Sequence, residues 1–148
     1  MIPGEVDHIA VYIGAEGKCI EAGATGKVVE FDCYDNWDAD RMLSQRGFLD
    51  KLYGISYPLK NKHSCQTKER QIRQDVVDYC FRQVGKPYNL NFFDSTTEET
   101  FYCSQLAYKA YLRNGINFNM DRGIIDNPLT KNIVFPQEIW ENCEHYIV

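Results

Sequence analysis

The stretch VDHIAVYI, residues 6–13, decides how the first third of the chain is interpreted. It is rich in β-branched and aromatic residues, and a strand with this alternation places His8 on one face and the branched aliphatic residues on the other. Two further short strands, residues 18–22 and 27–31, follow around glycine-containing turns, so we expect an antiparallel meander. Glu21 lies on the second of these strands, next to the strand that carries His8.

The rest of the chain predicts helices that pack against this sheet. Residues 66–84 repeat apolar side chains at helical spacing and stop at Gly85, and a second helix is expected from about residue 99 to 113. The other expected elements are a loop or short helix over 35–45, a strand within 49–59, a loop over 89–97, a turn at Asn127-Pro128, a short helix over 136–142 and a final strand over 144–148. In the loop over 89–97, Ser95, Thr96 and Thr97 are capping candidates for the second helix. The sequence therefore predicts an α+β fold, an antiparallel sheet with packed helices, in a single domain spanning residues 1–148.

Composition limits the classes of function. The chain has 148 residues, 44% of them hydrophobic, and a net charge of −5, so it can fold alone and is a poor candidate for binding nucleic acid. It contains no run of about 18 apolar residues, and MIPGEVDHIA lacks the features of a signal peptide. We therefore expect a soluble protein with no integral membrane segment, cytoplasmic if the chain is complete, and leave the native compartment open.

Cysteine spacing argues against a metal centre. The six cysteines stand at positions 19, 33, 65, 80, 103 and 143 and form no CxxC pair, so neither a zinc knuckle nor an iron–sulfur site is expected. We expect no metal and no organic cofactor. Most of these cysteines are interpreted as reduced, buried and structural.

Cys103 differs from the other cysteines because it falls in the opening turn of the second expected helix. The positive end of a helix favours a thiolate over a thiol, and a neighbouring imidazolium does so too. His63 lies in a charged, loop-like stretch and His145 in the last strand, whereas His8 lies on a strand beside Glu21, which could fix its tautomer. The residues alone leave open a second interpretation, a packed cysteine and a hydrogen-bonded core histidine.

Four motifs favour the catalytic interpretation of Cys103 and His8 over the packing interpretation. DHIAVYIG, CIEA, GKPY and FYCSQLAYKAY together resemble the permuted branch of the NlpC/P60 superfamily, the YiiX/YaeF/YycO-type permuted papain-like amidases, in which the histidine strand precedes the nucleophile helix. PQEIW resembles the closing segment of that family, whereas PGEV lies closer to the histidine strand than the family's first strand does. The resemblance implies a circularly permuted papain-like fold.

The same resemblance implies roles for single residues. Cys103 would be the nucleophile, His8 the general base and Glu21 the third member of the triad, with Tyr88 near the reacting carbonyl. The implied activity is cleavage of an amide bond through a thioester, in a peptide or small amide and possibly in cell-wall-type peptides. The oligomeric state is left open.

Two other functions are kept as alternatives. Residues 142–146, NCEHY, resemble the NCEHF motif of the lecithin:retinol acyltransferase family, although Cys143 is followed by too few residues to begin a helix. A lipid acyltransferase or thioesterase using Cys103 would need an apolar groove, for which residues 88–93 could form a rim. The other alternative is a catalytically silent binding domain in which Cys103 only packs.

Overall fold

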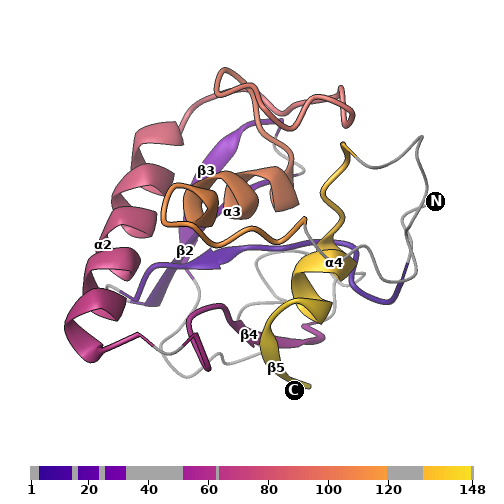
Figure 1. Ribbon diagram of the computed structural model, residues 1–148. Helices are drawn as coiled ribbons and strands as arrows, with labels where there is room; N and C mark the ends of the chain where they lie inside the picture. Colours follow the sequence, from indigo (N-terminus) through magenta and orange to yellow (C-terminus); the bar gives the residue numbers. More distant parts are fainter. Residues whose placement is uncertain are drawn as a thin grey trace.

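The computed structural model describes residues 4–14, 17–23, 26–32, 52–62, 64–119 and 132–147. The helices and strands are, in chain order, β1 Val11–Tyr12, β2 Lys18–Ala22, β3 Val28–Asp32, β4 Gly54–Tyr57, α2 Gln66–Gln83, α3 Cys103–Leu112, α4 Pro136–Glu141 and β5 Glu144–Ile147. Helices and antiparallel strands occur together, as the predicted α+β class requires (Figure 1).

The N-terminal sheet is the predicted meander. Its strand order is β1-β2-β3, and both pairs are antiparallel, with Ile20 opposite Val11 on one side and Glu30 on the other. The bounds of β2 are those predicted, and β3 begins and ends one residue later than expected. Because successive side chains alternate in a strand, Ile20 and Glu21 point to opposite faces of β2.

The strand predicted over residues 6–13 is much shorter than expected. Only Val11–Tyr12 pairs with β2. The backbone N–H groups of Glu5 and Val6 donate instead to Oε1 of Gln137, at 3.0 Å each. The segment before Val11 is therefore drawn toward α4, and His8 leaves the regular ladder for a position beside α3.

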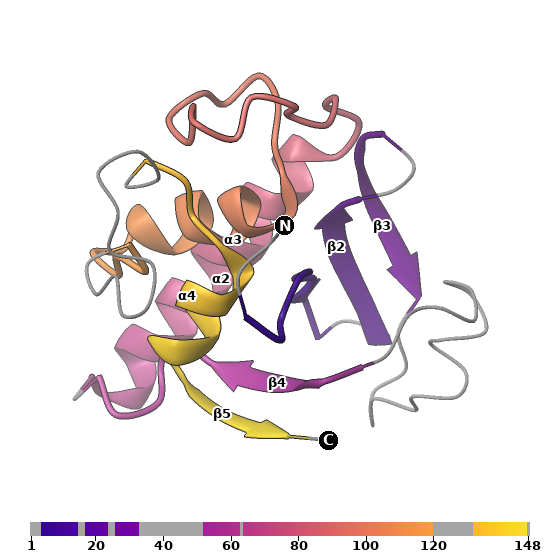
Figure 2. The same cartoon turned by 90° about the vertical axis from the view of Figure 1, so that its right-hand side faces the viewer.

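Helices α2 and α3 cover one face of this sheet (Figures 1 and 2). The buried core between them combines residues from the sheet and both helices: Val11, Ile13, Ile20, Ala22, Val28, Ile72, Val76, Tyr79, Cys80, Leu106, Ala107 and Ala110. The prediction for α2 is confirmed, since it runs over residues 66–83 and is followed by Gly85 at φ 95°. The buried apolar stripe of each helix fixes its place on the sheet.

Helix α3 begins later than expected, at Cys103 rather than near residue 99. Phe101 N–H donates to the Pro87 carbonyl at 3.1 Å, and Asn89 N–H donates to the Phe101 carbonyl at 3.0 Å. This short parallel bridge holds the chain extended up to Phe101, so no helix can form there. The capping candidates in residues 95–97 do not cap α3 either, because Tyr102 is the N-cap residue of this helix.

The C-terminal part forms a second, two-stranded antiparallel sheet of β4 and β5 (Figure 2). The strand within 49–59, the helix near 136–142 and the last strand are thus confirmed as elements. Gly54 allows this sheet to approach α4, since a Cβ there would lie 2.4 Å from the Trp140 ring. The expectations for 35–45 and for Asn127-Pro128 lie outside the described residues.

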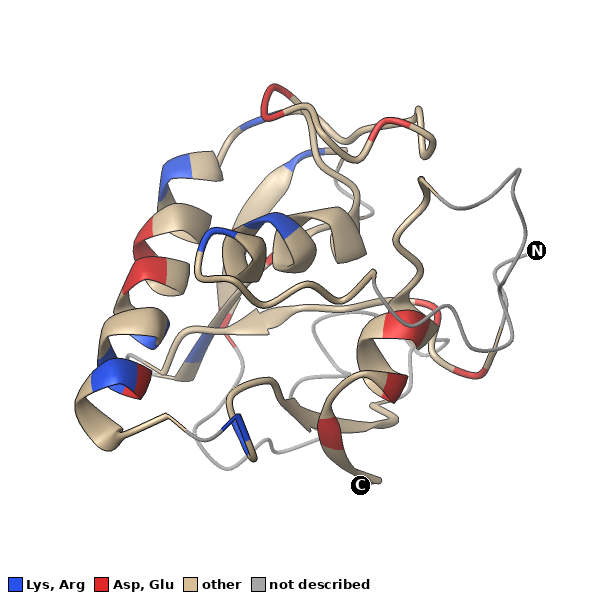
Figure 3. Ribbon diagram, viewed as in Figure 1, with Lys and Arg blue, Asp and Glu red and all other residues tan. Residues whose placement is uncertain are grey.

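Charged side chains are mixed over α2, whereas α4 and β5 carry acidic residues and no Lys or Arg (Figure 3). Within the described ranges, no helix has the length and apolar character needed to cross a membrane. The same residues contain no group of three or more His, Cys, Asp or Glu side chains placed to hold a metal ion.

Candidate active site

Cys103 is the first residue of α3 and is almost buried, with 7% of its surface exposed. Its neighbours on both sides are fixed to the segment before α4: Val134 N–H donates to the Tyr102 hydroxyl at 3.1 Å, and the Ser104 hydroxyl donates to the Val134 carbonyl at 2.5 Å. The backbone N–H groups of the first turn of a helix have no partner within the helix. The later start of α3 therefore brings Cys103 closer to the positive end of the helix than the sequence predicted.

The Cys103 thiol and the His8 imidazole are hydrogen-bonding partners. Burial alone would raise the pKa of Cys103, but the hydrogen bond and charge of His8, together with backbone hydrogen bonds at Ile9 and Ser104, lower the pKa below its ordinary value. These contacts favour the thiolate. The nearby imidazole and backbone donors thus outweigh the desolvation of the sulfur.

His8 also contacts Glu21, with 2.5 Å between Nε2 and Oε2. Burial would lower the pKa of His8, but the hydrogen bonds to Cys103 and Glu21 and the charges of both groups raise the pKa to about 9. The imidazole is therefore protonated near neutral pH when it faces the thiolate. The structure brings His8, Cys103 and Glu21 into one chain of contacts, drawn from α3, β2 and the segment before β1.

Tyr88 lies beside this chain of contacts. It forms the parallel bridge with Phe101, and its N–H donates to the Gly26 carbonyl at 2.9 Å. Burial and then the charge of Cys103 raise the pKa of its phenol, so the hydroxyl stays protonated and can donate a hydrogen bond. An open cleft on this side of the molecule is lined by His8, Gly23, Gly26, Tyr88 and Leu90.

Gln105 is a residue of the site that the sequence analysis missed. It is fully buried, and its Oε1 accepts from Tyr102 N–H at 2.9 Å, directly before Cys103. Its Nε2 donates to the Thr97 and Thr100 carbonyls at 3.0 and 3.2 Å. Helical spacing does not predict this burial, because Gln105 lies off the apolar stripe that Cys103, Leu106 and Ala107 share.

The other histidines and cysteines are placed differently. His63 lies outside the described residues, and His145 stacks on Trp140 and directs Nδ1 at the Trp140 and Cys143 carbonyls. Cys143 lies between α4 and β5, where burial raises the pKa of its thiol to about 12. An inert thiol of this kind does not support the rival NCEHY motif.

The expectation that most of the cysteines are reduced and buried does not hold for Cys19 or for Cys65. Cys19 is disulfide-bonded. Cys65 is free but exposed, whereas Cys80, Cys103 and Cys143 are free and buried. Cys19 lies on β2, two residues before Glu21.

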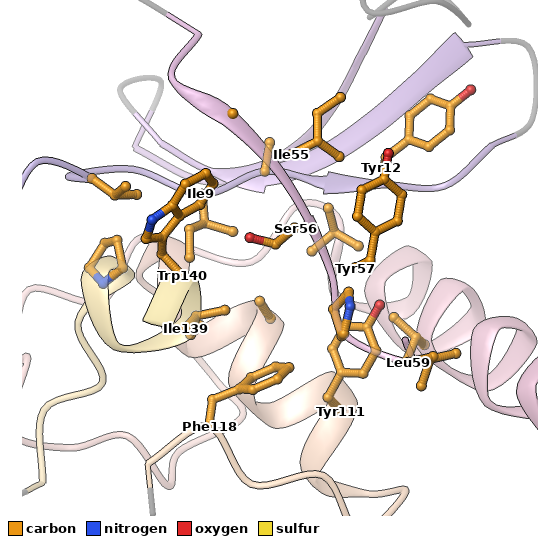
Figure 4. A pocket seen from close by; sticks show the side chains of 18 of the residues that line it. Ile9, Tyr12, Ile55, Ser56, Tyr57, Leu59, Tyr111, Phe118, Ile139 and Trp140 are labelled. Carbon is orange, nitrogen blue, oxygen red and sulfur yellow. The ribbon is translucent and has the colours of Figure 1, made fainter. Parts of the chain in front are cut away.

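A large cavity, about 1380 Å³, lies between the segment around β1, strand β4 and helices α2, α3 and α4. Aromatic and aliphatic side chains dominate its wall (Figure 4): Ile9, Tyr12, Ile55, Tyr57, Leu59, Tyr111, Phe118, Ile139 and Trp140. His8 and Ala107 also line it, so the cavity reaches the neighbourhood of Cys103. Among its charged residues, Glu5 and Lys60 are exposed and Glu69 is partly exposed.

The site joins a thiol of lowered pKa to a protonated imidazole, which in turn contacts a carboxylate. Such an arrangement can perform nucleophilic attack on a carbonyl carbon. A family model described as permuted papain-like amidase enzyme, YaeF/YiiX, C92 family, matches residues 1–144. Comparison with curated proteins and with solved structures gives no match.

Proposed function

Because the chain belongs to the permuted papain-like amidases of the YaeF/YiiX, C92 family, we propose that it is a cysteine amidase with Cys103 as nucleophile, His8 as acid and base, and Glu21 as the group that orients His8. The observation that carries the proposal is the hydrogen bond between Cys103 and His8, which goes with a lowered pKa at the sulfur and a raised pKa at the imidazole. Family membership confirms the resemblance seen in the sequence.

The first half of the reaction forms a thioester. The Cys103 thiolate attacks the amide carbon, and a C–S bond forms as the carbonyl oxygen becomes an oxyanion. The His8 imidazolium then gives its proton to the amide nitrogen, the C–N bond breaks and the amine leaves. Since Nε2 of His8 faces Glu21, Nδ1 is the nitrogen left for the thiol and the leaving group.

The second half returns the enzyme to its starting state. Neutral His8 takes a proton from water, the resulting hydroxide attacks the thioester carbon, and the C–S bond breaks to release the acid and the Cys103 thiolate. The oxyanion would accept hydrogen bonds from the backbone N–H of Cys103, at the start of α3, and from the hydroxyl of Tyr88. Glu21 keeps the imidazole in one orientation throughout.

Selective alkylation tests the proposal. Cys103 should react with iodoacetamide near neutral pH faster than the free, exposed Cys65 of the same chain, and His8→Ala should remove that advantage. Peptide mapping by mass spectrometry assigns the label to each cysteine. A Cys103 that reacts more slowly than Cys65, or equally fast in His8→Ala, contradicts the proposed activation and would favour a silent binding domain.

The apolar cavity of Figure 4 favours a second candidate, a thioesterase or acyltransferase that uses the same three residues on a lipid acyl ester. Ligand pockets in proteins have volumes of about 300–1,000 Å³ and mostly apolar walls. Ala107 and Tyr111 line the cavity and lie one and two turns after Cys103 on the same stripe of α3. An acyl chain attached to the sulfur could follow that stripe.

The dependence of the rate on acyl-chain length distinguishes the amidase from the thioesterase or acyltransferase. If the cavity holds an acyl chain, acylation of Cys103 by thioesters should accelerate from acetyl to palmitoyl, with each buried methylene contributing about 0.8 kcal/mol. An amidase without this use of the cavity should cleave peptide amides and show no such gain. Acylated Cys103 is measured by intact-protein mass spectrometry.

A further inference from the structure

We propose that Leu90, together with Tyr88, forms an apolar subsite at the mouth of the cleft, which binds an aliphatic or aromatic group of the substrate next to the reacting carbonyl. The inference deepens the proposed amidase function and rests on it. It concerns the loop between α2 and α3, which runs along the top of the molecule above α3 (Figures 1 and 2).

This loop exposes apolar side chains in an unusual concentration. Leu90 is 84% exposed, Phe93 60% and Phe92 44%, within four consecutive residues. Single exposed apolar side chains are common on protein surfaces, but a contiguous exposed group marks a site of interaction. Leu90, the most exposed of the three, is therefore a candidate for contact with a bound group.

The loop is held by its own hydrogen bonds although its tip is apolar. Asn89 is buried, and its Nδ2 donates to the Asp94 carbonyl at 2.9 Å and to Gln105 Oε1 at 3.0 Å. Its Oδ1 accepts from Asn91 N–H at 2.9 Å. These bonds close the turn and join its first residue, Asn89, to α3, so the outward position of Leu90 follows from the fold of the loop.

Aromatic contacts hold the same loop to the site. The Phe92 ring packs edge-on against Tyr102 at 5.4 Å and against Tyr88 at 6.4 Å between ring centroids. Tyr102 precedes Cys103 directly, and Tyr88 lines the cleft. Phe92 thus acts as a packing residue between the loop and α3, which leaves Leu90 on the cleft side.

Continuity with the cleft identifies the occupant as part of the substrate. Leu90 lines the same cleft as His8, which is the hydrogen-bonding partner of Cys103. Gly23 and Gly26, which line the same cleft, have no side chains to fill this space. Of the described side chains that line the cleft, His8 alone is charged, and its imidazole already contacts Glu21 and Cys103, so Leu90 and Tyr88 leave a mainly apolar surface for the group beside the scissile bond.

Two alkylating reagents test the subsite: iodoacetamide, and N-phenethyl iodoacetamide, which carries an apolar ring. The rate at Cys103 is divided by the rate at Cys65, which corrects for the intrinsic reactivity of each reagent. We expect the phenethyl reagent to be preferred at Cys103, and Leu90→Ala to reduce that preference by about fivefold, because part of a leucine side chain no longer buries apolar surface. Leu112→Ala is the matched control, since Leu112 is also exposed but lies at the other end of α3.

The outcomes keep the two proposals apart. Equal rates for both reagents, or a preference unchanged by Leu90→Ala, overturn the subsite. If the protein then sediments with phosphatidylcholine vesicles, the loop contacts lipid instead of substrate. Slow reaction of Cys103 with both reagents, insensitive to His8→Ala, contradicts the proposed amidase activation. The reagent preference is still measured in that case and decides the subsite.

Discussion

Asn89 donates a hydrogen bond from its carboxamide to that of Gln105 at 3.0 Å, and both side chains are buried. Gln105 Oε1 accepts at the same time from Tyr102 N–H, the donor just before Cys103. One glutamine therefore connects the start of helix α3 with the loop that carries Leu90. The position of the thiol and the shape of the cleft mouth depend on the same buried polar cluster.

Gln105→Ala is expected to destabilise the protein by about 2–4 kcal/mol, because each buried polar group left without a partner costs about 1–3 kcal/mol. The affected groups are Tyr102 N–H, the Asn89 amide and the Thr97 and Thr100 carbonyls. Urea denaturation followed by circular dichroism measures the loss.

The matched control is Gln74→Ala on the exposed side of α2, where the side chain makes a bond to Asp78 at 2.8 Å. That change should alter the free energy of unfolding by no more than about 0.5 kcal/mol. Similar losses in both variants would show that Gln105 does not hold the cluster together.

Glu21→Gln is expected to slow alkylation of Cys103 and amide hydrolysis by about tenfold. The carboxylate faces His8 Nε2 at 2.5 Å, and its hydrogen bond and charge raise the pKa of His8. A hydrogen bond to a charged group contributes about 1.5–3 kcal/mol, so its loss leaves less imidazolium to stabilise the thiolate. Glu30→Gln is the control, since Glu30 on the next strand pairs with Lys18 at 2.9 Å. Equal effects of the two substitutions would show that Glu21 has no specific role in orienting His8.

The antiparallel meander and helix α2 could be predicted from local patterns, because β-branched alternation and helical periodicity act over a few residues. The short β1 could not, since its extent depends on Gln137, far away in the chain, which takes the N–H groups of Glu5 and Val6. The late start of α3 has a similar cause, the bridge between Tyr88 and Phe101. Long-range hydrogen bonds of this kind leave no periodic signal in the sequence.

The residues proposed for the candidate site could be selected from the sequence, but the side chains and the disulfide around them could not. His8, Glu21, Cys103 and Tyr88 could be selected because residue type, strand pairing and motif resemblance point to the same chemistry. The role of Gln105 could not, since a glutamine in a helix is usually exposed. The disulfide at Cys19 could not be predicted either, because six cysteines do not specify which of them pair.

The pH dependence of the reaction follows from the two shifted pKa values. The pKa of Cys103 is lowered, so the thiolate is present below the ordinary range of a thiol, and the pKa of His8 is raised to about 9, so the imidazolium persists up to that pH. Hydrolysis should therefore rise as Cys103 loses its proton and fall again as pH passes about 9, where His8 can no longer protonate the leaving amine.

The same shifts predict the pH profile of alkylation, which needs only the thiolate. In His8→Ala the hydrogen bond and charge that oppose burial are lost, so the pKa of Cys103 should rise and the alkylation profile should move to higher pH. Rates are measured with iodoacetamide across the pH range for both proteins. Superimposable profiles would mean that His8 does not set the ionisation of the thiol.

Gly23→Ala should narrow the cleft without disturbing the fold. A Cβ at Gly23 would lie 3.4 Å from the Glu21 carboxyl carbon and 3.6 Å from His8 Cε1, which are ordinary contacts, and the backbone is not in the left-handed region. Replacing such a glycine by alanine commonly stabilises a protein by about 0.4–1 kcal/mol, because the unfolded chain loses freedom. The variant should therefore be at least as stable as the parent protein.

The effect of this substitution on catalysis should depend on the size of the substrate. The added methyl group would extend from the wall of the cleft that Leu90 also lines, beside His8 Cε1, into the space that a group next to the reacting carbonyl has to enter. For a pair of peptide amides that differ in having glycine or leucine at the residue whose carbonyl is attacked, kcat/KM for the leucine substrate should fall by about tenfold relative to the glycine substrate. An unchanged ratio would mean that substrates approach Cys103 from another direction and that Gly23 is only part of the turn after β2.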